Sequence, residues 1–171
     1  TAKYNLHTGE EPTQGGAAVA FVISENPKIA NIIPKGFAGS MRYEPGDFRK
    51  PDGRTVAIVD GKQSIASYLN EMKIAWLLYK KQLEKLNLFK LKKDETILDY
   101  ISKAIYHNPN TKMVRDAHTS LLLHEWRNLT RFNNIVKTIG EQPKRGNLDD
   151  LSFYQTNEYN DYRRKFIKTN E

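Results

Sequence analysis

The sequence predicts an α+β protein that is mostly α-helical, with an extended N-terminal arm and a small β-hairpin ahead of a body of three to four helices. Two observations predict this class. Most of the glycines and prolines lie before about residue 60, and the rest of the 171 residues shows helical periodicity. Turn residues between two alternating stretches precede that change. We expect one domain, with an arm at 1–16, a small irregular β part at 17–60 and a helical body at 61–171.

The arm and the irregular β part contain little that could fold independently. Residues 1–16 are rich in turn formers and have almost nothing to bury. The run "AAVAFVIS" at 17–24 does not alternate, which predicts a strand buried on both faces. The prolines and glycines that follow predict irregular structure, which is commoner where neighbouring subunits supply the missing contacts. The candidate partner-binding residues in this part are therefore Ile32, Ile33 and Phe37.

A β-hairpin is expected between residues 40 and 60. The stretches "SMRYEPGDFRK" and "RTVAIVD" alternate between apolar and polar positions on either side of "PDG". Pro51 presets the first turn position, Asp52 suits the second, and Gly53 accepts the left-handed conformation that follows. These three residues are the strongest turn signal in the sequence.

The first long helix has an unbroken apolar seam with alternating spacings of four and three residues. Such spacing places the side chains on one face of a helix over three heptads. Ser64 or Asp60 can cap its start. The seam consists of Ile65, Leu69, Met72, Trp76, Tyr79, Leu83 and Leu86.

Three further helices are expected. A shorter one starts near Asp94 or Glu95, has Ile97, Leu98, Ile101 and Ile105 on its inner face, and stops at Asn108-Pro109. A long one runs from about Thr111 to Ile139 through Trp126 and ends at Gly140 and Pro143. After a turn at "KRGNLDD", the last helix places Tyr159, Tyr162 and Phe166 on one side.

The stretch "KPDGRTVAIVDGKQ" at 50–63 resembles the metal-binding signature of the restriction-endonuclease-like superfamily. That resemblance implies that Asp52 and Asp60 bind magnesium and that Lys62 assists the attacking water. However, an extended strand would separate the two carboxylates by roughly 20–26 Å, too far to share one ion. The favoured interpretation places Asp52 in a turn and Asp60 at a helix N-cap, and a magnesium nuclease stays a remote alternative.

Other enzyme signatures are absent from the sequence. The chain has no cysteine, which excludes disulfides, thiolate metal sites and thiol catalysis. Neither phosphate-binding glycine motif nor a Gly-x-Ser-x-Gly elbow occurs. His118 and His124 are six residues apart on one helix, so they lie on different faces and cannot chelate one ion. We expect no catalytic residue, no metal site and no cofactor.

Basic residues mixed with aromatic ones are the remaining signal. The net charge is +7, from 27 Lys and Arg against 20 Asp and Glu, and basic surfaces favour polyanionic partners. Alternatively, the aromatic side chains are buried and the lysines form a solvated face. The nucleic-acid-contact candidates are Lys80, Lys81, Lys92, Lys93, Arg163, Arg164 and Lys165.

Together these features favour a non-enzymatic structural or adaptor subunit of a large assembly that contains nucleic acid, such as a phage particle or a ribonucleoprotein. Its partners would be neighbouring protein subunits, with DNA or RNA as further candidates. A stand-alone nucleic-acid-binding protein that uses basic helices is the alternative. The longest apolar run, "AAVAFVI" at 17–23, has seven residues, which is too short to span a membrane. With no signal-peptide pattern either, we expect a soluble chain in a virus particle or an intracellular complex.

Overall fold

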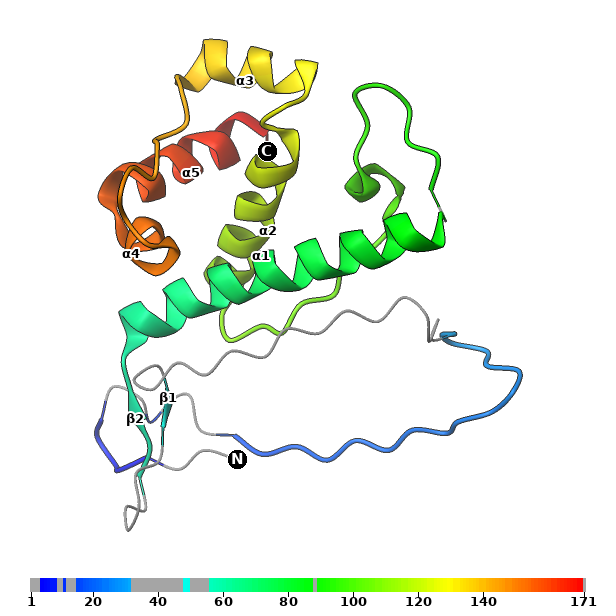
Figure 1. Cartoon of the computed structure of the whole chain (residues 1–171). Coiled ribbons are helices and arrows are strands. Elements are labelled where there is room, and N and C mark those ends of the chain that lie inside the picture. The colour runs from blue at the N-terminus through cyan, green and yellow to red at the C-terminus, as the bar shows by residue number, and fades with distance from the viewer. Residues whose placement is uncertain are drawn as a thin grey trace.

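The computed structural model describes residues 4–8, 11, 15–31, 48–49, 56–87 and 89–170. Within these ranges the protein is mostly helical, as the sequence predicts (Figure 1). None of the helices there combines the length and the apolar composition that crossing a bilayer needs. The elements in chain order are β1 (Phe48–Arg49), β2 (Ile58–Val59), α1 (Gly61–Leu86), the 3-10 turn η3 (Ile97–Tyr100), α2 (Thr111–Trp126), α3 (Thr130–Ile139), α4 (Asp150–Gln155) and α5 (Asn157–Asn170).

Helix α1 follows the predicted seam over most of its length. Leu69, Trp76 and Leu83 are buried, because α1 packs against α2 and α4 along this face. Ile65, near the start of the helix, is 40% exposed and lies at the edge of that contact. The helix ends at Asn87, which adopts the left-handed conformation and donates its backbone N–H to the carbonyls of the last turn.

The long helix predicted from Thr111 to Ile139 is two helices, so that prediction is wrong about its continuity. The chain turns at Arg127–Leu129, where the Leu129 N–H donates to the Trp126 carbonyl. Helix α3 then starts at Thr130, whose backbone N–H donates to the carboxylate of Asp94 from a distant loop. The break therefore depends on a contact between segments 36 residues apart.

The prediction of a helix between Asp94 and Asn108 is also wrong, because only the single turn η3 forms there. Thr96 and Asp99 make a capping box at its start. Ile101 then becomes extended, and Ile105 is 97% exposed rather than on an inner face. The β-branched residues of this stretch lower its helix propensity, and side-chain contacts with α1 and α3 hold the segment in its irregular path.

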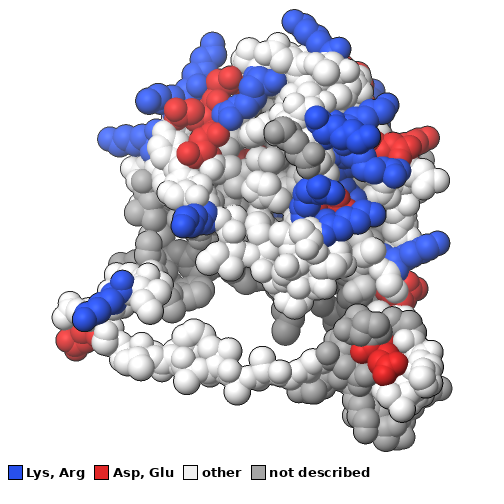
Figure 2. All heavy atoms as spheres, turned by 180° about the vertical axis from the view of Figure 1, so that it is seen from behind, with Lys and Arg blue, Asp and Glu red and all other residues white. Residues whose placement is uncertain are grey.

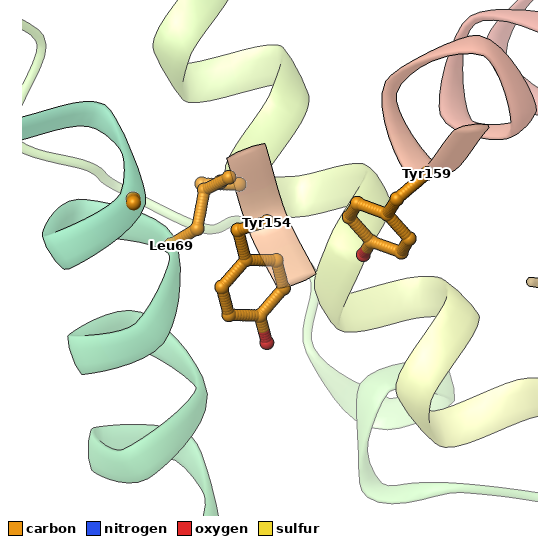
Figure 3. Packing of buried hydrophobic residues seen from close by; sticks show 5 residues of the cluster. Leu69, Tyr154 and Tyr159 are labelled. Carbon is orange, nitrogen blue, oxygen red and sulfur yellow. The ribbon is translucent and has the colours of Figure 1, made fainter. Parts of the chain in front are cut away.

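The core consists of three clusters that all use α2. One joins α1, α2, α4 and α5 through Ala66, Leu69, Ala117, Tyr154 and Tyr159, three of which are labelled in Figure 3. A second joins α2, α3 and α5 through Leu123, Phe132, Ile135, Tyr162 and Phe166. The third joins α1, η3 and α2 through Trp76, Leu83, Ile97 and Leu121. Tyr159, Tyr162 and Phe166 thus share the buried side of α5, as predicted.

The N-terminal part differs most from its prediction. The strand expected at 17–24 is absent: residues 15–31 have no strand and their apolar side chains are exposed, because no neighbouring strand pairs with them in the described chain. Strands β1 and β2 pair antiparallel, with Phe48 opposite Val59. The turn predicted at 51–53 and the candidate partner-binding residues Ile32, Ile33 and Phe37 lie outside the described residues.

Candidate functional site

Two cavities border helix α2 on different sides. The first, which we call the histidine cavity, has a volume of about 630 Å³. The second, which we call the basic cavity, has a volume of about 420 Å³. His118 belongs to the first and His124 to the second, and the 100° rotation per helical residue turns these side chains away from each other.

The histidine cavity lies between α2 and the irregular segment that precedes it. Its wall is mixed: apolar side chains dominate, and the two cations Lys103 and Arg115 contribute positive charge. Asp99 brings a carboxylate that is already paired with Arg131. The apolar and aromatic residues of the lining include Leu98, Ile101, Val114, Leu122 and Trp126.

Tyr106 and His118 form the polar centre of the histidine cavity. The Tyr106 hydroxyl lies 2.6 Å from His118 Nδ1, and the two rings meet edge to face. Burial raises the pKa of Tyr106 and lowers the pKa of His118, so both groups are neutral near pH 7. A neutral phenol donates to an unprotonated Nδ1, which leaves the histidine proton on Nε2. The pair is therefore a neutral hydrogen bond that fixes the orientation of both rings.

His107 is next to the same cavity, because its neighbours Tyr106 and Asn108 both line it. Its backbone carbonyl accepts a 2.6 Å hydrogen bond from the Tyr68 hydroxyl on α1, and the two rings lie 6.4 Å apart. The His107 side chain itself is exposed and has no hydrogen-bond partner among the described residues. The backbone is thus fixed while the imidazole remains open to a ligand.

The burial of His118 and His124 predicts that stability falls as the pH drops below about 6.5. Burial lowers the pKa of both imidazoles in the folded chain, whereas an unfolded histidine titrates near 6.5. Below that pH the unfolded chain binds more protons than the folded one, so acidification favours unfolding. Urea unfolding at pH 7.5 and pH 5.5 should show the loss, and His118→Gln should reduce the difference between the two pH values.

The matched control is His107→Gln, which changes an exposed histidine. The variant should keep the pH dependence of the unmodified chain. An unchanged difference between the two pH values in His118→Gln would contradict the assignment to His118.

The basic cavity lies between α1, α2 and the segment before α4. Asp150 is its carboxylate, and it accepts from Lys73 at 3.1 Å and from Arg145 at 2.8 Å. Arg127 and Lys144 also line it and make no ion pair within the described ranges. Burial, and then the charge of Arg127, lowers the pKa of His124. The cavity therefore carries a positive potential that suits an anion.

Of the two aspartates in the nuclease resemblance, only Asp60 lies within the described residues. Asp60 is the N-cap of α1, and its Oδ1 accepts from the backbone N–H groups of Lys62 and Gln63, at 3.0 Å each. This agrees with the favoured interpretation of that aspartate. Asp52 lies outside the described residues, and no group of three potential metal ligands occurs within them.

The nucleic-acid-contact candidates do not share one environment. Arg163 is buried and donates to Asp116 on α2. Lys80 donates to Glu125, whose side chain is only 2% exposed and also accepts from Trp76 Nε1. Arg164 pairs with Asp161, and Lys92 lies 3.9 Å from Glu95. Lys81, Lys93 and Lys165 are exposed, and Figure 2 shows many basic side chains spread over the helical body. A role in nucleic-acid contact stays a prediction for these seven residues.

Sequence reasoning missed the histidine cavity. Tyr106 and His118 are 12 residues apart, and they meet only because the helix predicted over 94–108 does not form. The nearest signal in the sequence was "YHNPN" at 106–110, which combines a tyrosine and a histidine with a helix stop and the Asn110 N-cap of α2.

Comparison with known proteins identifies relatives for most of the chain. Residues 32–169 match the family described as hydroxymethylglutaryl-coenzyme A synthase C terminal. The hydroxymethylglutaryl-CoA synthase of Haloferax volcanii is 30% identical over 155 residues, which cover 91% of this chain and 32% of that protein. The protein of the same name from Enterococcus faecalis is 32% identical over 116 residues, 68% of this chain and 27% of its own length. No solved structure matches the chain.

These matches correct the function expected from the sequence. The family and the curated relatives are named as synthases, so the expectation of a non-enzymatic subunit of a virion or nucleic-acid assembly is wrong. A basic charge favours an anionic partner, but charge alone does not distinguish nucleic acid from smaller anions. The chain spans about a quarter to a third of the length of the curated relatives that it matches.

Proposed function

Because residues 32–169 match its C-terminal model, the chain belongs to the hydroxymethylglutaryl-CoA synthase family, and from this we propose that it forms part of an enzyme that acts on hydroxymethylglutaryl-CoA or a related acyl-CoA thioester. The family match is the observation that carries the proposal. The relatives support it, since the synthases of Haloferax volcanii, Enterococcus faecalis and mouse mitochondria each align with most of the chain.

The histidine cavity suits one end of such a ligand. A CoA thioester combines phosphate groups with a long arm of low charge that ends in the acyl group. Apolar side chains such as Leu98 and Val114 can contact the arm, and Lys103 and Arg115 add positive charge at the same wall. The net charge of +7 also favours an anionic ligand.

Proton transfer is the chemical task that we assign to His107. Reactions at the carbon beside a thioester carbonyl move a proton, and histidine is the side chain best matched to that task near neutral pH. The Nδ1 of His118 is occupied by Tyr106, whereas the imidazole of His107 is open and its backbone is fixed by Tyr68. The Tyr106–His118 pair is then a positioning element beside it.

We also propose that the chain has an extended arm and a β-hairpin and that it contacts neighbouring protein chains. Its proposed domain division is an arm at 1–16, a β part at 17–60 and a helical body at 61–171. In an acyl-CoA enzyme, the helical body would supply the cavity, and the N-terminal part would connect that body to the other elements of the protein.

Titration of the isotope-labelled chain with hydroxymethylglutaryl-CoA tests the proposal. The imidazole resonances of His107 and His118 should shift in a saturable way, whereas that of His124, which lines the basic cavity, should shift less. His107→Asn should leave binding within about threefold, because the proposed task of this residue is proton transfer and not affinity.

Duplex DNA of equal phosphate content is the control ligand. The absence of any saturable shift at His107 and His118, or equal shifts with DNA, would contradict the acyl-CoA proposal. Leu98→Asp is the matched cavity variant, because it places a charge in the apolar wall and should abolish the shifts.

A further inference from the structure

Residues 15–31 carry large apolar side chains that no part of the described chain covers. Phe21, Val22 and Ile23 are 84%, 99% and 94% exposed, and Ile29 is fully exposed. In Figure 1 the segment runs as an open trace away from the helices, and in Figure 2 it stands off the helical body. Single exposed apolar residues are ordinary, but three in succession form an apolar patch of the kind that is typical of interaction sites.

The backbone of this segment is equally uncovered. No backbone hydrogen bond joins residues 15–31 to another described residue. The run "AAVAFVI" at 17–23 is β-branched or aromatic at its large positions and does not alternate, which is typical of a strand covered on both faces. Residues with these properties form a strand when a sheet edge supplies the missing hydrogen-bond partners.

The same segment is part of the alignment with the Haloferax volcanii synthase. That alignment covers 155 of the 171 residues, so only 16 residues of the chain lie outside it. Residues 17–24 therefore fall inside it wherever it begins. In that relative the alignment covers 32% of the length, so about two-thirds of the polypeptide lies elsewhere. This amount of protein is sufficient to provide both a sheet edge and the layers that cover it.

We propose that residues 17–24 dock as an internal β-strand on a sheet supplied by the part of a hydroxymethylglutaryl-CoA synthase that this chain does not span. The strand joins the sheet through backbone hydrogen bonds, and its two faces are covered by apolar layers. The inference rests on the family membership and on the exposure of the segment, and it does not require acyl-CoA binding. The partner is this part of the synthase, whether it lies on the same polypeptide as residues 17–24 or on a second one.

Hydrogen exchange measured by mass spectrometry tests this docking. In one arm, the whole chain is co-expressed with the remaining two-thirds of the Haloferax volcanii synthase. In the other arm, the chain replaces the matched third within one polypeptide. Exchange at residues 17–24 should slow by on the order of 100-fold or more relative to the chain alone. Protection in the first arm identifies a separate partner polypeptide, and protection in the second arm alone identifies a connected one.

Substitutions examine the two faces separately. Phe21 and Val22 are consecutive, so in a strand their side chains leave opposite faces. Phe21→Asp and Val22→Asp should each remove the protection, whereas Val22→Thr should keep it because threonine is also β-branched. Lys28→Asp, which lies outside the strand, is the matched control and should leave the protection intact. Because Phe21 and Val22 are exposed in the chain alone, the aspartate substitutions should not change the unfolding curve of the chain measured without the synthase part.

Two results would overturn the docking. Residues 17–24 could stay unprotected in both arms, even where the polypeptides co-purify. Alternatively, the chain alone could protect them in a concentration-dependent way, which would show that the partner is a second copy. Protection of the strand without an acyl-CoA response at His107 would retain the docking and reject only the proposed ligand.

Discussion

Replacement of Arg163 by methionine is expected to reduce the free energy of unfolding by about 3–5 kcal/mol. The side chains of Arg163 and Asp116 are 4% and 8% exposed, and Arg163 Nη2 lies 2.9 Å from Asp116 Oδ2. Without the arginine, the carboxylate stays buried on α2 with no cation to balance it. Urea unfolding followed by circular dichroism measures the loss directly. Because α5 packs on α2 through this pair, the change should appear as a shift of the whole transition.

The control is the next residue along the helix. Arg164 is 66% exposed and pairs with Asp161 on the same helical face, so Arg164→Met should change stability by less than about 1 kcal/mol. A double variant, Arg163→Met with Asp116→Leu, should recover most of the loss, since removal of both charges leaves no unpaired group. Two nitrogens of Arg163 have no partner in the described structure, which favours this recovery. Equal effects of Arg163→Met and Arg164→Met would contradict the buried ion pair.

Phe166→Ala is expected to reduce the free energy of unfolding by a similar amount, about 3–5 kcal/mol. The ring is 2% exposed and packs with Leu123 and Phe132, and its centroid lies 6.0 Å from that of Trp126. Truncation would leave a cavity where α2, α3 and α5 meet. The midpoint of urea unfolding should fall, and the slope of the transition should not change.

The matched control for this truncation is Leu148→Ala, at a side chain that is 43% exposed. Its effect should stay below about 1 kcal/mol, because half of its surface already contacts water. Phe166→Leu should lie between the two, since it retains most of the apolar volume. If Phe166→Ala were no more harmful than Leu148→Ala, the α2–α3–α5 cluster would not be a core.

The helical pattern could be predicted where it depends on local spacing. The seam through Leu69, Trp76 and Leu83 and the buried side of α5 follow from the 3.6-residue period alone. The break between α2 and α3 does not, because the apolar period continues through Trp126, Leu129 and Phe132. That break is stabilised by Asp94, which caps Thr130, and such a contact across 36 residues leaves no local pattern.

The candidate site could not be predicted from the sequence, because it also depends on contacts between distant residues. Tyr106 and His118 interact only after the chain folds back on α2. Two of the basic residues chosen as nucleic-acid contacts, Lys80 and Arg163, pair with the buried carboxylates of Glu125 and Asp116. A count of charges does not show which cations are already neutralised by buried partners, and it favoured a non-enzymatic subunit of a nucleic-acid assembly, which the family match contradicts.

The positions of the two tryptophans give the chain a built-in pair of optical reporters. Trp76 donates to Glu125 in the cluster of α1, η3 and α2, whereas Trp126 packs on Phe166 and lies 5.1 Å beneath the Arg131 guanidinium in the cluster of α2, α3 and α5. Their fluorescence therefore reports on different halves of the helical body. With Trp76→Phe and Trp126→Phe, each emission signal can be followed alone, and coincident transitions would show that the two halves melt as one cooperative unit.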